Sequence, residues 1–220
     1  MSKPFWDVEE TTGFVLIKSP IDSLQYKVYN TGTPEERQKV ADLLASVRRE
    51  MNKLLVYLCK HPKLWLNKQI ALGIFLTFDI HMPCVCKIIE QIYSSKTFND
   101  DLNNLIISEC TKMSKLFSIQ EMTPNNHGII GLNKPKKTKF IKVPGTNQEY
   151  EVASKRSFHL TIRKGNKIDD YETIMGLFLH EITHTTCNDI HWKDDNHQYP
   201  YGEYHSFMRK CAKECGISFN

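Results

Sequence analysis

Long hydrophobic runs are missing from this chain of 220 residues. The longest apolar stretch, Ile70–Phe78, contains Gly73 and Thr77 and is followed by Asp79, whereas a membrane-spanning helix needs about 20 apolar residues. The N-terminus also lacks an apolar run between a basic start and a small-residue cleavage site. We therefore expect neither a membrane span nor a secretory leader, and an intracellular protein.

Paired cysteines are missing as well. The seven cysteines include no Cys-x-x-Cys pair, and the two short spacings are Cys84-x-Cys86 and Cys211-x3-Cys215. This spacing indicates neither a disulfide framework nor a cysteine-rich zinc module. We expect most of these cysteines to be buried free thiols.

A strong bias of composition or charge is also absent. Hydrophobic residues make up 40% and charged residues 25% of the chain, which is typical of globular rather than disordered proteins. The net charge of +4 is too small to indicate a polyanionic partner by itself. The length is sufficient for one core. We expect an α+β fold in one compact domain, with a mainly helical part over 1–122 and a second part over 123–220.

Two short strands and a long helix are predicted near the N-terminus. Phe14–Ile17 and Tyr26–Tyr29 are rich in β-branched and aromatic residues. Thr33 has the properties of an N-cap, with a proline at the next position and Glu36 three residues on. Apolar residues then recur at helical spacing, which predicts a helix that ends before His61. Two further helices are predicted over 84–94 and 99–117.

Strands are predicted again after residue 123. A hairpin is expected from 140–143 and 148–152, around Pro144-Gly145. Apolar and polar residues alternate over 158–163, which is typical of a half-exposed strand near a sheet edge. Lysines are frequent between 134 and 142, where they indicate either a solvated loop or phosphate contacts; they are Lys134, Lys136, Lys137, Lys139 and Lys142.

Asp169, with Glu172 three residues later, is expected to cap a helix that extends into 180–188. This helix contains an H-E-x-x-H pentapeptide, His180 to His184. Residues four apart share one face of a helix, so the two imidazoles can bind one Zn²⁺ while Glu181 lies beside them. The alternative is a pair of solvated surface histidines, but the apolar segment before them favours the metal site.

A third zinc ligand is expected from the residues downstream, because catalytic zinc usually has three protein ligands and one open position. Apolar residues at helical spacing predict a last helix over 200–216. His205 lies inside that stripe, as a packed or hydrogen-bonded residue, whereas His197 lies in the loop before it and can return to the metal. We favour His197, with His205 and then His191 as alternatives.

The last third of the chain resembles the zincin-type metallopeptidases of the WLM and SprT-like kind, most closely those of large DNA viruses. The matching residues are a strand that ends in Arg163 and the segment Thr173–His184. A histidine followed by an aromatic residue four positions later and an alanine fifteen positions later completes the pattern, and His197, Tyr201 and Ala212 satisfy it. The family usually has phenylalanine where Tyr201 stands.

This resemblance implies a zincin-like fold with a helical N-terminal scaffold, a small mixed sheet and an active-site helix, and with 123–220 as the catalytic part. It implies a zinc-dependent endopeptidase in which His180, His184 and His197 hold Zn²⁺ and Glu181 is general base and then proton donor. An exposed edge strand, expected over 158–163, would pair with an extended polypeptide substrate.

Several roles around this site stay open. His159 or Arg163 either approaches the oxyanion or is a surface residue. The loop aspartates either orient the ligand imidazoles or are simply solvated; they are Asp189, Asp194 and Asp195.

Two other functions stay open as well. One is a non-catalytic, zinc-stabilised binding or virion protein, and the other is cleavage of DNA-bound proteins, supported by the lysines of 134–142. A viral enzyme would act in the host cytoplasm or in the virion. The oligomeric state is left open.

Overall fold

The computed structural model describes residues 13–61, 64, 68, 117–122, 130–142, 149–164, 167–187 and 201–220. It contains both helices and small sheets, which confirms the α+β class. The elements are β1 (Phe14–Lys18), β2 (Gln25–Tyr29), α1 (Pro34–Lys60), β3 (Phe117–Glu121), β4 (Gly131–Lys142), β5 (Glu149–Leu160), β6 (Arg163–Lys164), β7 (Lys167–Ile168), α5 (Tyr171–Cys187) and α6 (Tyr201–Glu214). None of the described helices is long and apolar enough to cross a membrane.

The N-terminal elements agree with the sequence. Strands β1 and β2 pair antiparallel, and α1 begins with the predicted capping box, in which the Thr33 side chain accepts from the Glu36 amide and the Glu36 side chain accepts from the Thr33 amide. Helix α1 ends at Lys60, with His61 as its C-cap. The predicted helices over 84–94 and 99–117 lie outside the described residues, except that Phe117 begins β3. No strand was predicted at 117–121.

Strands β3, β5 and β4 form a three-stranded sheet in that order, with β3 parallel and β4 antiparallel to β5. The predicted hairpin is confirmed, since Phe140 pairs with Glu151. The prediction of an edge strand over 158–163 is wrong, because β5 runs through to Leu160 between β3 and β4, and Arg163 begins the separate strand β6. Side-chain alternation indicates which face of a strand is apolar, but it does not indicate whether one or two neighbouring strands pair with it.

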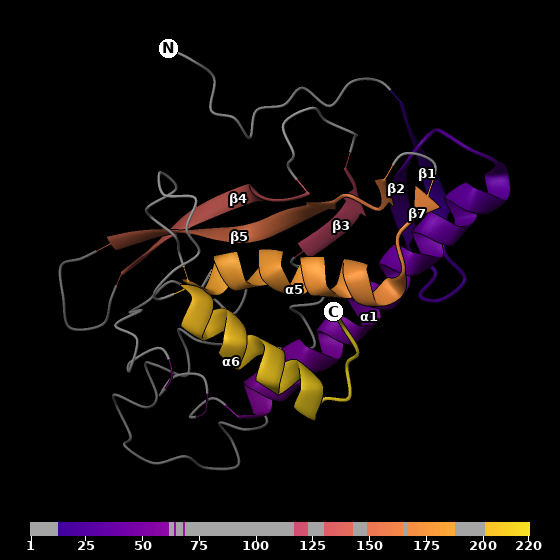
Figure 1. Cartoon of the computed structure of the whole chain (residues 1–220). Coiled ribbons are helices and arrows are strands. Elements are labelled where there is room, and N and C mark those ends of the chain that lie inside the picture. The colour runs from indigo at the N-terminus through magenta and orange to yellow at the C-terminus, as the bar shows by residue number, and fades with distance from the viewer. Residues whose placement is uncertain are drawn as a thin grey trace.

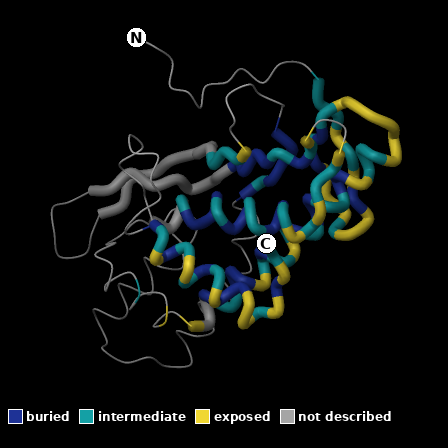
Figure 2. The backbone as a smooth tube through the Cα atoms, viewed as in Figure 1, coloured by how far each residue is buried: buried dark blue, intermediate teal, exposed yellow. Residues whose placement is uncertain are grey.

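Helix α5 lies between this sheet and α6, and α1 runs past both helices (Figure 1). Over residues 171–184, all of α5 except Glu172 is buried or half-buried (Figure 2). Phe178 packs on Phe158 and Phe117 of the sheet, with ring centroids 4.9 and 5.8 Å apart, respectively. The fully buried face of α5 consists of Ile174, Met175, Phe178, Leu179 and Ile182. These residues recur three and four apart, so burial of one apolar stripe holds α5 on the sheet.

The N-terminal end of α5 is fixed by neighbouring segments. Asp170 rather than the predicted Asp169 caps its start, since the Asp170 carboxylate accepts from the Thr173 amide at 2.8 Å. Asp169 instead pairs with Lys164 at 3.3 Å. The residues after α6 return to the same place, where the Asn220 amide donates to the Glu172 carbonyl at 3.2 Å.

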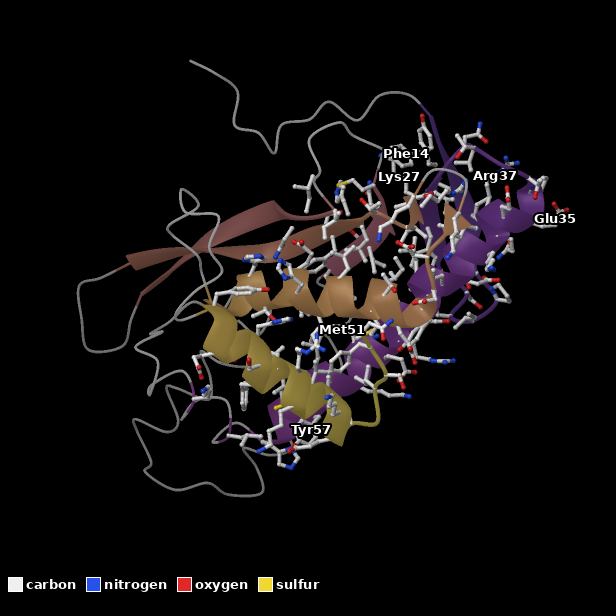
Figure 3. All side chains as sticks on the ribbon, in the orientation of Figure 1. Phe14, Lys27, Glu35, Arg37, Met51 and Tyr57 are labelled. Carbon is white, nitrogen blue, oxygen red and sulfur yellow. The ribbon has the colours of Figure 1, made fainter. Side chains whose placement is uncertain are left out.

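Helix α6 has the predicted buried stripe, which consists of Tyr201, Tyr204, Met208, Cys211 and Ala212. Gly216, at φ +73°, follows its end as expected for a helix terminator. The Tyr57 hydroxyl of α1 donates to Glu214 at 2.6 Å, at the end of α6, where Figure 3 shows it. One continuous core joins residues of α1, α5, α6 and the sheet.

A buried ion pair connects the end of β3 to β6. Arg163 Nε lies 2.9 Å from Glu121 Oε1, with the two side chains 11% and 2% exposed. The Tyr29 amide donates to the other Glu121 oxygen at 2.7 Å, and Arg163 Nη1 donates to the Thr31 carbonyl at 2.8 Å. Burial raises the pKa of Glu121, although the Tyr29 amide and Arg163 act to lower it. The pair therefore attaches the β1–β2 hairpin to the sheet.

Replacing Arg163 with methionine should destabilise the protein, because Glu121 would stay buried without its cation. We expect the free energy of unfolding at neutral pH to fall by about 3–5 kcal/mol, measured by urea denaturation. Lys53→Met, which breaks the more exposed pair with Glu50, should cost no more than about 1 kcal/mol. Equal losses in the two variants would contradict this role.

The loss of unfolding free energy in Arg163→Met should also depend on pH, and it should become smaller at low pH. Without Arg163 the pKa of Glu121 in the folded state rises further above its unfolded value. A raised folded-state pKa favours folding below the unfolded pKa, and that contribution is lost as the pH rises through the folded pKa. The deficit of Arg163→Met should therefore shrink as the pH is lowered towards about 4.5.

Candidate metal centre

The C-terminal half of α5 carries the two histidines of the pentapeptide. His180 and His184 are four residues apart and so lie about 40° apart around the helix axis. Their Nε2 atoms are 3.2 Å apart, and their ring centroids are 4.9 Å apart at an interplanar angle of 76°. Both side chains are half-buried. The structure thus brings the two predicted ligands together, with the same ring nitrogen of each at the contact.

This separation is suitable for two ligands of one zinc ion. Two nitrogens at Zn–N distances of 2.0–2.1 Å and a tetrahedral angle lie roughly 3.3 Å apart, close to the 3.2 Å between the two Nε2 atoms. The same distance also permits a hydrogen bond between neutral imidazoles without a metal. The pair is near the C-terminal end of α5, where the helix dipole favours a positive charge. The donor set therefore fits Zn²⁺.

Glu181 occupies a different position on the helix. It is about 100° further round than His180, towards the sheet, and its side chain is buried, with 6% of the residue exposed. Burial raises the pKa of its carboxyl group to about 8. A cation bound nearby would lower this pKa again. A buried carboxyl group with a raised pKa, one residue from a histidine of a close pair, is a typical feature of a functional site.

Strand β4 contacts Glu181 at two points. The side-chain amide of Asn133 donates to the Glu181 carbonyl at 2.9 Å. The Glu181 carboxylate lies against Gly131, where a methyl group would come within 2.8 Å of Cγ and Cδ. Neither Gly131 nor Asn133 was predicted from the sequence as a functional residue. A glycine at the start of a strand is the signal that could have indicated this close approach.

Tyr201, the first residue of α6, packs against the histidine pair. Its hydroxyl donates to the His180 carbonyl at 3.0 Å. Its ring stacks on that of His184, with centroids 4.4 Å apart and an interplanar angle of 29°. Tyr201 is only 2% exposed. It therefore fixes the start of α6 to the end of α5 and restricts the orientation of the His184 ring.

His205 also lies close to the pair. Its ring centroid is 5.8 Å from that of His180, and its ring stacks on Tyr201 at 5.6 Å. Tyr201 thus stacks on both His184 and His205. Across the described part of the chain, no group of three histidine, cysteine or acidic side chains has a geometry suited to a metal ion. His205 is thus a close neighbour of the pair, and its role as the alternative third ligand stays a prediction.

The favoured third ligand, His197, lies outside the described residues, as does His191. The same is true of the three aspartates that were considered as partners of the ligand imidazoles, Asp189, Asp194 and Asp195. Their roles stay predictions.

The two polar residues considered for the oxyanion are not surface residues. His159 is only 5% exposed and stands on the face of β5 opposite to Phe158, which packs on α5. Arg163 forms the buried pair with Glu121. The surface alternative is therefore wrong for these two residues, since His159 is buried and the Arg163 side chain is paired with the buried Glu121 carboxylate. Their approach to an oxyanion stays a prediction.

The lysines of 134–142 belong to β4 rather than to a loop. Their side chains lie outside the described residues. Contact with nucleic acid, and with it a preference for DNA-bound substrates, stays a prediction.

Comparisons with known proteins give no relative for this arrangement. No family model, curated protein or solved structure matches the chain. The resemblance to zincin-type metallopeptidases therefore depends on the motif residues alone, and the chemistry has to be argued from the geometry of α5 and its neighbours.

The histidine pair should be required for zinc binding. We expect purified protein to retain about one zinc ion per chain, and His180→Ala or His184→Ala to lose most of it, because each removes one of the converging nitrogens. Zinc content after dialysis, measured by mass spectrometry, tests this. His61→Ala, at the exposed end of α1, is the matched control. Unchanged zinc content in both pair variants would exclude the site.

The third ligand can be identified in the same way. His197→Ala should reduce zinc affinity by at least about tenfold, whereas His205→Ala should leave it nearly unchanged, since His205 stacks on Tyr201 instead of joining a metal-binding group. Competition with a chromogenic chelator measures both affinities. The reverse order would assign the position to His205.

Proposed function

We propose that this protein is a zinc-dependent endopeptidase. The observation that supports the proposal most strongly is the 3.2 Å separation of the His180 and His184 Nε2 atoms on α5. The buried Glu181 carboxyl group on the same helix adds a proton acceptor next to them. Two converging imidazoles and one carboxyl group are the parts that metal-assisted hydrolysis of an amide requires.

His180, His184 and the favoured third ligand, His197, would hold the ion. Zinc bound there supplies activation of a water molecule and polarisation of the scissile carbonyl. Glu181 accepts the proton of the attacking water and then donates it to the leaving amine nitrogen. A purely structural zinc site has no use for a buried carboxyl group beside its ligands, so Glu181 favours the catalytic alternative.

The sheet supports a polypeptide as the substrate. Within the described residues β4 has a paired neighbour on one side only, which is β5. Strand β4 also contacts α5 and begins at Gly131, beside Glu181. An extended polypeptide can add to such an edge through main-chain hydrogen bonds. We infer that β4, in place of the strand first expected, aligns a polypeptide with the carboxylate, as the edge strand of a zincin-like fold would.

Glu181→Gln should abolish proteolysis without releasing zinc, because the amide keeps the shape of the side chain and cannot accept the proton. We expect kcat on an unstructured protein substrate to fall by about 10²–10⁴-fold, with the zinc content equal to that of the wild type. Glu203→Gln, on the exposed face of α6, is the control and should retain full activity.

Two results would contradict the proposed function. One is a zinc-loaded wild-type protein that is as inert as Glu181→Gln, which would favour the structural-zinc alternative. The other is a Glu181→Gln variant that cleaves the substrate at the wild-type rate.

A further inference from the structure

Two residues at the start of β4 contact the same residue of α5, Glu181. Gly131 lies against its side chain, and Asn133 donates a hydrogen bond to its carbonyl. Residues 131 and 133 are two apart in a strand, so both face the same side of the sheet, the side on which α5 lies. One residue of the helix is therefore contacted twice by one face of one strand.

The position of this strand face is fixed by the core. Gly131 is paired with Leu160 and Asn133 with Phe158, and both partners on β5 are completely buried. Phe158 also packs directly on Phe178 of α5, at 4.9 Å between ring centroids. Strand β4 is therefore held in register at its start by backbone pairing with the buried end of β5.

The two contacts act on different parts of Glu181. Asn133 holds the backbone, through the hydrogen bond of 2.9 Å to the carbonyl oxygen. Gly131 leaves space for the side chain, because a methyl group there would lie 2.8 Å from both Cγ and Cδ. All three atoms nearest to that methyl group belong to the Glu181 side chain. A larger residue at 131 would thus displace the carboxylate and not the backbone.

The conformation of Gly131 gives no separate reason for a glycine. Its φ lies outside the left-handed region, unlike that of Gly32 and Gly216, so an alanine can adopt the same backbone. The remaining physical reason for a missing side chain at this position is the volume occupied by the Glu181 carboxylate.

We propose that Gly131 and Asn133 are positioning residues for the catalytic carboxylate. Asn133 sets the distance of the Glu181 backbone from the sheet. Because Gly131 has no side chain, it leaves the space in which the carboxylate lies. This inference rests on the proposed function, in which Glu181 is the base. It adds that β4, the strand expected to align the substrate, also positions the base. The backbone of β4 would then determine where the substrate and the base lie relative to each other.

The steric part is tested on the zinc-free protein by a double-mutant cycle of stability. Gly131→Ala should lower the urea midpoint of unfolding in the chain that has Glu181. In the Glu181→Ala background, where Cγ, Cδ and the carboxylate oxygens are gone, the same substitution should leave the midpoint unchanged. Equal shifts in the two backgrounds would overturn the steric contact.

The positioning part is tested by kinetics on the zinc-loaded protein. Gly131→Ala should reduce kcat by about 10²-fold, the effect of a displacement of roughly 1 Å in a reacting group, with KM and zinc content little changed. Asn133→Ala should lower kcat in the same way. Gly13→Ala is the matched control, because its methyl group would also press on a side chain, that of Tyr29 on β2 at 2.9 Å, and not on Glu181.

The outcomes separate the two proposals. If the stability cycle is positive but kcat is unchanged in Gly131→Ala, the positioning role is overturned. It is also overturned if Gly131→Ala loses zinc, or if Gly13→Ala loses as much kcat as Gly131→Ala. If the wild-type protein and Glu181→Gln are equally inactive, the proposed function fails and the positioning role fails with it, whereas the stability cycle still reports whether the carboxylate occupies the space at Gly131.

Discussion

The structure depends on the burial of one apolar stripe of α5 against the central strand of a three-stranded sheet. Phe178 is at the centre of that contact, with Phe158 and Phe117 on the sheet side. Because the stripe determines the rotation of α5, it also determines where the next residues around the helix point. His180 and His184 emerge at the border of the buried face, while Glu181 is turned towards β4. The geometry of the candidate metal centre is thus a consequence of apolar packing.

The two buried glutamates, Glu121 and Glu181, have different electrostatic surroundings. Glu121 has a guanidinium partner, Arg163, and the Tyr29 amide, and it serves to join the hairpin to the sheet. The raised pKa of Glu181 is caused by burial alone. Burying a carboxyl group without a compensating charge costs stability, and such a cost is typical of a group that is kept for chemistry rather than for folding.

Much of the helical framework could be predicted from the sequence because its signals are local. The capping box at Thr33, the four-residue spacing of His180 and His184, and the stripe that begins at Tyr201 each lie within a few turns of helix. The sheet was predicted less well. Alternation over 158–163 indicated an edge strand, but β5 is central, because pairing on its second side comes from β3, about forty residues earlier in the chain.

The sequence by itself determined the helix with two histidines on one face and a glutamate next to the first of them, because this follows from residue types and the 3.6-residue period. The proposed chemistry is based on that pattern. Only the tertiary structure decided which strand lies beside that glutamate, that Gly131 and Asn133 contact it, and that Arg163 belongs to a buried ion pair. The physical reason is that these contacts join residues some forty or more positions apart. Such contacts depend on how core surfaces fit together, and no local periodicity encodes that fit.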